Sequence, residues 1–213
     1  GMYGFRSFHS ILPGSAFEYY SGMGFNRSVN TDPDGSYYAM RSVNSTKYLI
    51  IQSYKLEYSD TVTLLENLKN FEKIDEQDGF TIFKNKAYIP IGYSNSFYIS
   101  DDEYEKIAKS NRDNMLARAV VLTDEQIEKY GDILPELEPD RYSDFNYYTF
   151  EKDAQELAKT AVDTFTPTAN GFKATSSFTE DRFVTFTVPW ESGWSATING
   201  EKAEIEKVNR GVM

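Results

Sequence analysis

The sequence predicts an α+β fold, in which a mixed α/β N-terminal layer is followed by a helix and a C-terminal antiparallel β-sandwich-like meander. Two observations support this prediction. Polar and apolar residues alternate over 183–188, which is the period of a strand with one buried face. Between residues 100 and 163, apolar residues instead recur every three or four positions behind residues that commonly cap helices, which is typical of α-helices.

The predicted meander has three strands. The first covers residues 183–188 and ends at Pro189, because proline has no N–H group to donate to a neighbouring strand. The second covers residues 194–198 and the third covers residues 201–208. Asn199-Gly200 joins the last two, and this pair is typical of a type I′ turn, in which both residues need a positive φ. We therefore expect a hairpin there.

The N-terminal part is expected to mix short helices and strands. Turn residues and apolar spacing predict helices over 13–20, 36–43 and 60–70. A buried strand is expected over 47–53, where an apolar run is bounded by polar residues. Asp78-Gly79 predicts a hairpin turn. Residues 88–93 are expected to form an edge or irregular strand, because they contain Pro90.

Helix signals dominate from residue 100 onward. Two pairs have the spacing of a capping box, Ser100 with Glu103 and Thr123 with Gln126, and the second predicts a helix over 124–130. Asn111 is expected to cap a helix between them.

The clearest helical face spans residues 151–163. Its apolar residues are Ala154, Leu157, Ala158, Ala161 and Val162. Before it, Pro135 and Pro139 predict a surface loop that acts as a hinge. The chain is therefore divided into a mixed α/β domain, 3–145, and a helix with a truncated β-sandwich meander, 146–213.

Composition excludes several classes of function. The chain has 33 acidic and 22 basic residues and a net charge of −11, which disfavours binding to nucleic acid. It has no cysteine, so disulfides, thiolate metal sites and cysteine nucleophiles are excluded. No apolar run approaches the roughly 18 residues that a membrane-spanning helix needs.

The C-terminal motif resembles a known family. The sequence from Pro189 reads Pro-Trp-x-x-Gly-Trp-x-x-x-Ile-Asn-Gly, and Asn209-Arg210-Gly211 follows it. This order is similar to the C-terminal extracytoplasmic part of the YfhO family of bacterial multi-spanning membrane proteins. The matching positions are Pro189, Trp190, Gly193, Trp194, Asn199, Gly200, Asn209 and Gly211.

The middle of the chain extends the resemblance. The matching positions there are Ser42, Val43, Lys47, Tyr48, Leu49, Ile50, Asp78, Gly79, Asn85 and Pro90. One departure is the run 89–92, Ile-Pro-Ile-Gly, where the family commonly has Leu-Pro-Arg or Leu-Pro-x-Ala. The family pattern continues with further strands and a membrane span, so the chain is expected to be a piece of a longer protein.

The resemblance implies a membrane-embedded glycosyltransferase of the GT-C type. Such enzymes use lipid-phosphate-linked sugars to modify cell-envelope glycopolymers such as lipoteichoic acid, and their catalytic carboxylate lies near the N-terminus of the full protein. We therefore expect a non-catalytic extracytoplasmic domain, without a cofactor, that shapes the acceptor site or binds the glycopolymer. Its expected partners are the protein's own transmembrane region and an envelope glycan or lipid-linked sugar. The expected localisation is the cell membrane.

Five residues are candidate ligand-binding residues: Trp190, Glu191, Trp194, Tyr19 and Tyr20. Aromatic side chains stack on sugar rings, and a glutamate between two tryptophans can accept hydrogen bonds from hydroxyl groups. The alternative for the aromatic residues is packing, on the sandwich core or beneath a loop.

No catalytic or metal-binding residue is predicted. The single histidine, His9, has no second ligand near it in the sequence. Asp32-Pro33-Asp34-Gly35 resembles the start of a calcium loop, but its twelfth position is Val43 rather than glutamate.

Two other functions stay open. A protein-interaction module of the cell envelope would expose an apolar patch. An independent glycan hydrolase would instead hold two carboxyl groups with perturbed pKa values across a cleft.

Overall fold

The structure, a computed structural model, describes residues 13–25, 38–58 and 68–213. The helices are α1 (Gly14–Gly22), α2 (Met40–Val43), α3 (Ser53–Tyr58), α5 (Asp101–Lys106), α6 (Arg112–Met115), α7 (Asp124–Tyr130) and α8 (Tyr147–Ala158), with 3₁₀ turns η1 (Lys109–Asn111) and η2 (Pro139–Tyr142). The strands are β1 (Tyr48–Gln52), β2 (Phe71–Gln77), β3 (Phe80–Asn85), β4 (Tyr98–Ser100), β5 (Val120–Leu122), β6 (Thr164–Thr168), β7 (Gly171–Thr175), β8 (Ala196–Ile198) and β9 (Glu201–Ala203). This mixture of helices with mainly antiparallel strands confirms the α+β class.

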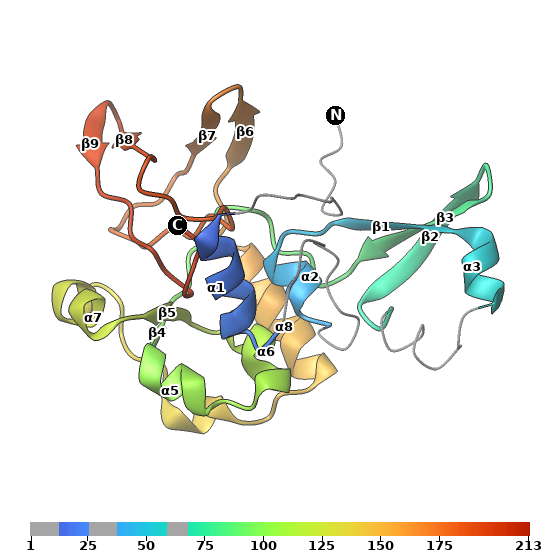
Figure 1. Cartoon of the computed structure of the whole chain (residues 1–213), viewed down its shortest axis with the longest axis horizontal. Helices are drawn as coiled ribbons and strands as arrows, with labels where there is room; N and C mark the ends of the chain where they lie inside the picture. The colour runs from blue at the N-terminus through green and yellow to red at the C-terminus, as the bar shows by residue number, and fades with distance from the viewer. Residues whose placement is uncertain (1–12, 26–37, 59–67) are drawn as a thin grey trace.

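The described strands form several small sheets. An antiparallel sheet has the order β1-β3-β2, and β4 pairs in parallel with β5. The hairpins β6–β7 and β8–β9 are separate two-stranded sheets. In Figure 1 the sheet of β1, β3 and β2 projects away from the helical body, and the two C-terminal hairpins extend from another side of it.

The C-terminal hairpin is confirmed, but the meander is not continuous. Asn199 and Gly200 have φ values of 53° and 89°, as a type I′ turn requires. The prediction of a strand over 183–188 was wrong. The backbone of Thr185 exchanges hydrogen bonds with Tyr93, and the N–H of Phe186 donates to the carbonyl of Met213, so this stretch pairs with segments far away in the sequence. The predicted third strand, 201–208, ends at Ala203.

The hairpin β6–β7 was missed. Its two-residue loop is Ala169-Asn170, and Pro167 lies within β6. Proline argues against a central strand, but in a two-stranded sheet both strands are edges and can accommodate it.

The helix predicted over 151–163 lies earlier in the chain. Helix α8 begins after Asn146, whose side chain accepts hydrogen bonds from the N–H groups of Tyr148 and Thr149. It ends at Ala158, and Ala161 instead pairs with Tyr93. The apolar face was recognised, but the cap that sets its register was not.

Several local predictions in the N-terminal part are confirmed. Helix α1 occupies the predicted position and continues to Gly22, and α2 covers the described end of the helix predicted over 36–43. The β2–β3 hairpin turns at Asp78-Gly79, with φ values of 53° and 77°. Most of the helix predicted over 60–70 lies outside the described residues, and 68–70 form a turn.

Two expectations about strands need correction. Strand β1 forms where it was predicted, but it is not buried, because Tyr48 and Ile50 are exposed. Residues 88–93 form no strand beyond an isolated bridge at Tyr93. They form a loop in which the side chain of Ile89 is buried in the core.

The predicted caps also differ in outcome. Thr123 and Gln126 form the expected capping box at α7, and the side chain of Ser100 accepts from the N–H of Glu103 at α5. Asn111 occupies the predicted N-cap position of α6, but its side chain makes no capping hydrogen bond.

The core contains residues from all three described ranges of the chain. Its largest fully buried side chains include Tyr93, Tyr104 and Phe150, and Val208 and Val212 near the C-terminus pack in the same cluster. The division near residue 145 stays a prediction. In the described ranges, no helix combines the length and apolar character needed to cross a bilayer.

Candidate functional site

A groove of about 810 Å³ lies beside α8. Its walls come from residues 94–97 before β4, from the turn between α6 and β5, from the loop 140–144 and from α8 with the residues after it. The lining side chains are mostly polar. Those used below are Asn95, Phe97, Arg118, Arg141, Lys152 and Asp153.

Arg118 organises one wall of the groove. Its side chain is only 5% exposed, and its Nε donates to Oδ2 of Asp153 over 2.5 Å. The guanidinium group also lies 4.7 Å from the centre of the Phe145 ring, a cation–π contact. A buried arginine is stable only where its charge and its donors are satisfied, and Asp153 supplies the charge.

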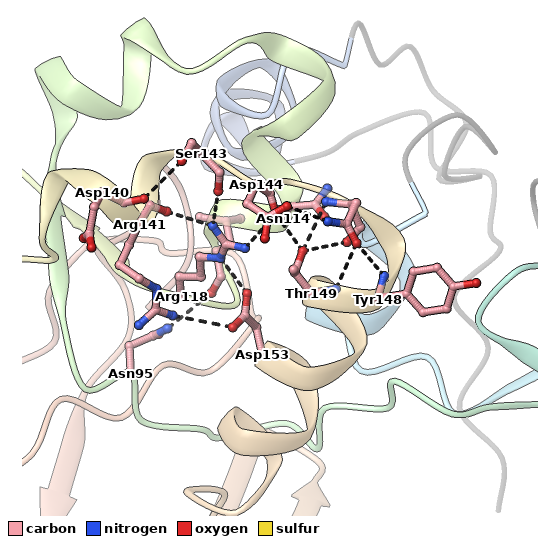
Figure 2. A network of polar contacts seen from close by, with 12 residues as sticks. Asn95, Asn114, Arg118, Asp140, Arg141, Ser143, Asp144, Tyr148, Thr149 and Asp153 are labelled. Carbon is pink, nitrogen blue, oxygen red and sulfur yellow. Dashed lines mark hydrogen bonds and ion pairs between the residues drawn. The ribbon is translucent and has the colours of Figure 1, made fainter.

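The remaining donors of Arg118 hold the loop before α8. One terminal nitrogen donates to the carbonyls of Arg141 and Ser143, over 2.7 and 2.8 Å, and the other donates to the carbonyl of Asp144 over 3.3 Å. Figure 2 shows these bonds converging on the guanidinium group. Arg118 is therefore committed to the protein, and its role is to shape the groove.

Asp153 is also committed. Its Oδ1 lies 3.5 Å from a terminal nitrogen of Arg141, while its Oδ2 accepts from Arg118. Two arginines therefore contact the carboxylate, one buried and one about half exposed. Each oxygen of Asp153 therefore faces one arginine.

The groove has no net formal charge. Its lining includes four basic residues, Arg118, Arg141, Lys152 and Lys159, and four acidic residues, Asp140, Asp144, Asp153 and Glu156. Amide and hydroxyl groups lie between them, and Phe97, Ala117 and Leu157 contribute apolar surface. Such a lining suits a ligand with many hydroxyl groups better than a strongly charged one.

At the base of the groove, Asn95 is 3% exposed, and its amide nitrogen donates to the carbonyl of Leu116 over 3.3 Å. The amide oxygen of Asn95 and the hydroxyl of Ser94 have no hydrogen-bond partner within the described part of the chain. Unpaired polar atoms are uncommon in protein interiors. The base of the groove is therefore polar and incompletely satisfied.

Tyr19 and Tyr20 do not form a surface. Their side chains are 3% and 6% exposed, and the two rings pack edge to face with centroids 5.5 Å apart. Burial raises the pKa of Tyr19 well above its ordinary value. The structure therefore places both rings in the core, away from the groove.

Trp190, Glu191 and Trp194 lie at the surface of the C-terminal part. Trp190 is partly buried, and its Nε1 donates to the carbonyl of Ile205 over 3.3 Å. Glu191 is exposed and accepts from the hydroxyl of Ser15 over 3.4 Å. Ligand binding by these residues stays a prediction.

Trp194 belongs to an aromatic cluster. Its ring packs on Phe172, whose ring packs in turn on Phe165 and Phe186. The cluster joins the β6–β7 hairpin to the stretch around Thr185. One side of Trp194 therefore has a packing role, and the ring is only partly exposed.

The described residues contain no group of three or more histidine, cysteine, aspartate or glutamate side chains placed to hold a metal ion. Asp113 is a carboxyl group whose pKa is raised, by burial, to about 6. It lies in the core, where it accepts from the N–H groups of Ala39 and Met40, and not in the groove.

The sequence analysis did not identify the groove. One signal was present, because Arg118 interrupts an apolar run from Met115 to Leu122. A lone arginine in such a run predicts a buried ion pair, but its partners lie up to 35 residues away and have no recognisable spacing.

Comparison with known protein families shows which family this chain belongs to. A family described as "Bacterial membrane protein YfhO" matches residues 1–144 and 140–213, which together cover the chain. The chain belongs to the YfhO family. No curated protein and no solved structure matched it.

The YfhO motif residues have structural roles in this chain. Asn199-Gly200 forms the hairpin turn, while Asn209 and Gly211 contact β5 and α1. Membership of a family of bacterial membrane proteins supports membrane association of the protein.

Proposed function

We propose that this chain is a non-catalytic, extracytoplasmic domain of a glycosyltransferase-like YfhO protein, and that its groove binds sugar units of a cell-envelope glycopolymer. The observation that carries the proposal is the groove beside α8, in which four basic and four acidic residues balance, while hydroxyl and amide side chains lie beside apolar surface. A glycan acceptor needs this combination of many hydrogen-bonding groups and little net charge.

The size and lining of the groove support a carbohydrate ligand. Its volume lies within the range of small-molecule sites, and Phe97 offers apolar surface to the C–H face of a sugar. Arg141 is about half exposed and Lys152 is exposed, so both can donate to hydroxyl groups. Arg118 and Asp153 on the buried wall are already paired with each other, which favours binding and positioning over catalysis.

Titration of the purified chain tests the binding. Deacylated lipoteichoic acid and short neutral oligosaccharides are added, and the dissociation constant is measured by calorimetry and by NMR shifts. We expect Arg141→Ala and Lys152→Ala to weaken binding at least about fivefold, the loss of one hydrogen bond at a ligand. Lys173→Ala, an exposed lysine on β7, is the matched control and should leave binding unchanged.

Two outcomes count against this proposal. Loss of binding in Trp194→Ala, with full binding in both groove variants, would move the site to the C-terminal aromatic surface. An unsubstituted chain that binds no glycan at millimolar concentration would remove the carbohydrate role.

A separate experiment tests the side of the membrane. The chain has no cysteine, so Tyr148→Cys introduces a single thiol in this domain at a side chain that is 79% exposed. In intact cells carrying the membrane-bound protein without other cysteines, a membrane-impermeant maleimide should label it. Labelling only after permeabilisation would show that the domain is cytoplasmic.

A further inference from the structure

The three-stranded sheet exposes an unusual number of apolar side chains. Tyr48 and Ile50 on β1 are 44% and 46% exposed, and Phe80 on β3 is 42% exposed. In the strand register Ile50 lies opposite Ile82, Tyr48 opposite Lys84 and Gln52 opposite Phe80. Residues that alternate along a strand share one side of the sheet. Tyr48, Ile50, Ile82 and Phe80 therefore lie on the same side, which we call the β1 face.

The opposite side of this sheet is already covered. Phe83 and Thr81, which alternate with the residues of the β1 face along β3, are 8% and 1% exposed. The hydroxyl of Thr81 also forms a 2.9 Å hydrogen bond with that of Ser53 at the start of α3. An antiparallel sheet with one covered side normally presents polar residues on the other. The apolar β1 face therefore departs from the normal pattern.

Charges are distributed unevenly across this sheet. Basic residues flank the β1 edge, with Lys47 directly before the strand and Lys84 opposite Tyr48. The ammonium group of Lys47 lies 5.6 Å from the centre of the Tyr48 ring. Acidic residues concentrate on β2, at the far edge, where Glu72, Asp75 and Glu76 are exposed; Glu72 and Asp75 lie opposite Lys84 and Ile82, on the same side of the sheet as the β1 face. The β1 edge is thus apolar and basic, although the whole chain has a net charge of −11.

The sheet is placed to reach a flat surface. In Figure 1 it extends outward from the body, with α3 at its far end. Tyr54, on α3, is 55% exposed and adds a tyrosine at the far end of the sheet, while Tyr48 lies where β1 begins, nearer the body (Figure 1). Tyrosine favours the lipid–water interface, because its ring is apolar and its hydroxyl is polar. Lysine can bury its aliphatic stem there while its ammonium group reaches lipid phosphates.

We propose that the β1 face, with Tyr54, Lys47 and Lys84, contacts the lipid headgroup region of the bilayer in which this YfhO protein is embedded. Because the chain belongs to a family of bacterial membrane proteins, a bilayer is the surface available for this contact. Apolar side chains then enter the headgroup boundary, the lysines meet anionic phosphates, and the acidic β2 edge stays in water. This contact is independent of the groove, and it would fix the height and tilt of the domain above the membrane.

Vesicle flotation tests the proposal without any glycan present. The purified chain is mixed with vesicles of phosphatidylglycerol and phosphatidylcholine, and with vesicles of phosphatidylcholine alone. We expect binding to the mixed vesicles that is weaker on phosphatidylcholine alone, since the lysines then lose their anionic partners. The variant Ile50→Ser/Phe80→Ser should reduce the partition coefficient at least about tenfold, because two apolar contacts are lost.

A matched control distinguishes vesicle binding through the β1 face from nonspecific hydrophobic adsorption. Ile198→Ser changes an exposed isoleucine on β8, at the other end of the molecule, and should leave vesicle binding unchanged. Circular dichroism checks that each variant keeps the fold, as expected for exposed side chains.

Three results would overturn the proposal. These are no flotation of the unsubstituted chain, equal losses in Ile50→Ser/Phe80→Ser and Ile198→Ser, and a concentration-dependent dimer that Ile50→Ser/Phe80→Ser abolishes while vesicle binding persists. The last would show that a second copy covers this face. Because the vesicles carry no sugar polymer, failure here leaves the glycan proposal standing, and the converse also holds.

Discussion

Asn209 and Val121 are joined by two hydrogen bonds, although 88 residues separate them. The N–H of Val121 donates to the side-chain oxygen of Asn209 over 2.8 Å, and the N–H of Asn209 donates to the carbonyl of Val121 over 3.1 Å. These two bonds attach the C-terminal segment to β5. One of the positions at which this chain resembles the YfhO family thus anchors the end of the chain to the core.

Replacing Asn209 should lower stability in a defined way. Asn209 is 4% exposed and has a φ of 50°, so Asn209→Gly keeps the backbone conformation but leaves the buried N–H of Val121 unpaired. We expect a loss of about 1–3 kcal/mol in the free energy of unfolding, measured by urea denaturation. The control is Asn199→Gly, at a φ of 53° on the exposed hairpin, which should change stability by under about 0.5 kcal/mol. Equal effects would mean that the side-chain bond contributes nothing.

Gly211 permits a close approach between the C-terminal segment and α1. A Cβ atom at this position would lie 2.0 Å from the carbonyl oxygen of Ser15 and 2.8 Å from the backbone nitrogen of Tyr19. Because the backbone of a helix cannot move aside locally, Gly211→Ala should cost about 3 kcal/mol or more in a urea titration. Gly193→Ala is the matched control, since nothing lies within 4 Å of its Cβ position. A stable Gly211→Ala variant would contradict this packing.

Local sequence signals predicted local structure well. The turns at Asp78-Gly79 and Asn199-Gly200 and the capping box at Thr123 are fixed by the conformational preferences of two to four neighbouring residues. These features need no knowledge of the rest of the chain. They were therefore readable from the sequence.

The long-range pairing partners of backbone segments could not be predicted from local sequence in the same way. The alternation over 183–188 is the pattern of a strand, but its hydrogen bonds go to Tyr93 and Met213, which lie far away along the sequence. The exposed side of β1 was also missed, because a run of apolar residues does not show which side is covered. The groove depends on Arg118 reaching residues 141–153, and tertiary packing alone brings them together.

Arg118 should be irreplaceable by lysine. A single ammonium group cannot donate at once to Asp153 and to the carbonyls of residues 141, 143 and 144, as the planar guanidinium group does. We expect Arg118→Lys to lower the free energy of unfolding by about 2 kcal/mol or more and to speed amide exchange in the loop 140–145. Arg182→Lys, at a more exposed ion pair with Glu180, should change neither quantity appreciably. Unchanged loop exchange in Arg118→Lys would show that other contacts hold the groove.

Asp113 should make the protein less stable as the pH rises from about 4 to 6. Burial raises its pKa to about 6 in the folded state, although Asn114 and two backbone N–H groups oppose the shift. In the unfolded chain its pKa is about 3.9, so the folded state holds the proton more tightly and ionisation favours unfolding. The contribution of this group is fully present below pH 4 and is lost as the pH passes 6, with a total of about 2–3 kcal/mol.

The variant Asp113→Asn isolates this contribution, because an amide resembles the protonated carboxyl group and does not titrate. Urea unfolding of both proteins at pH 4, 5, 6 and 7 should show the variant gaining stability relative to the unsubstituted chain as the pH rises. The exposed substitution Glu201→Gln controls for the change in net charge and should show no such trend. A stability difference between Asp113→Asn and the unsubstituted chain that stays constant over this range would mean that Asp113 titrates normally despite its burial.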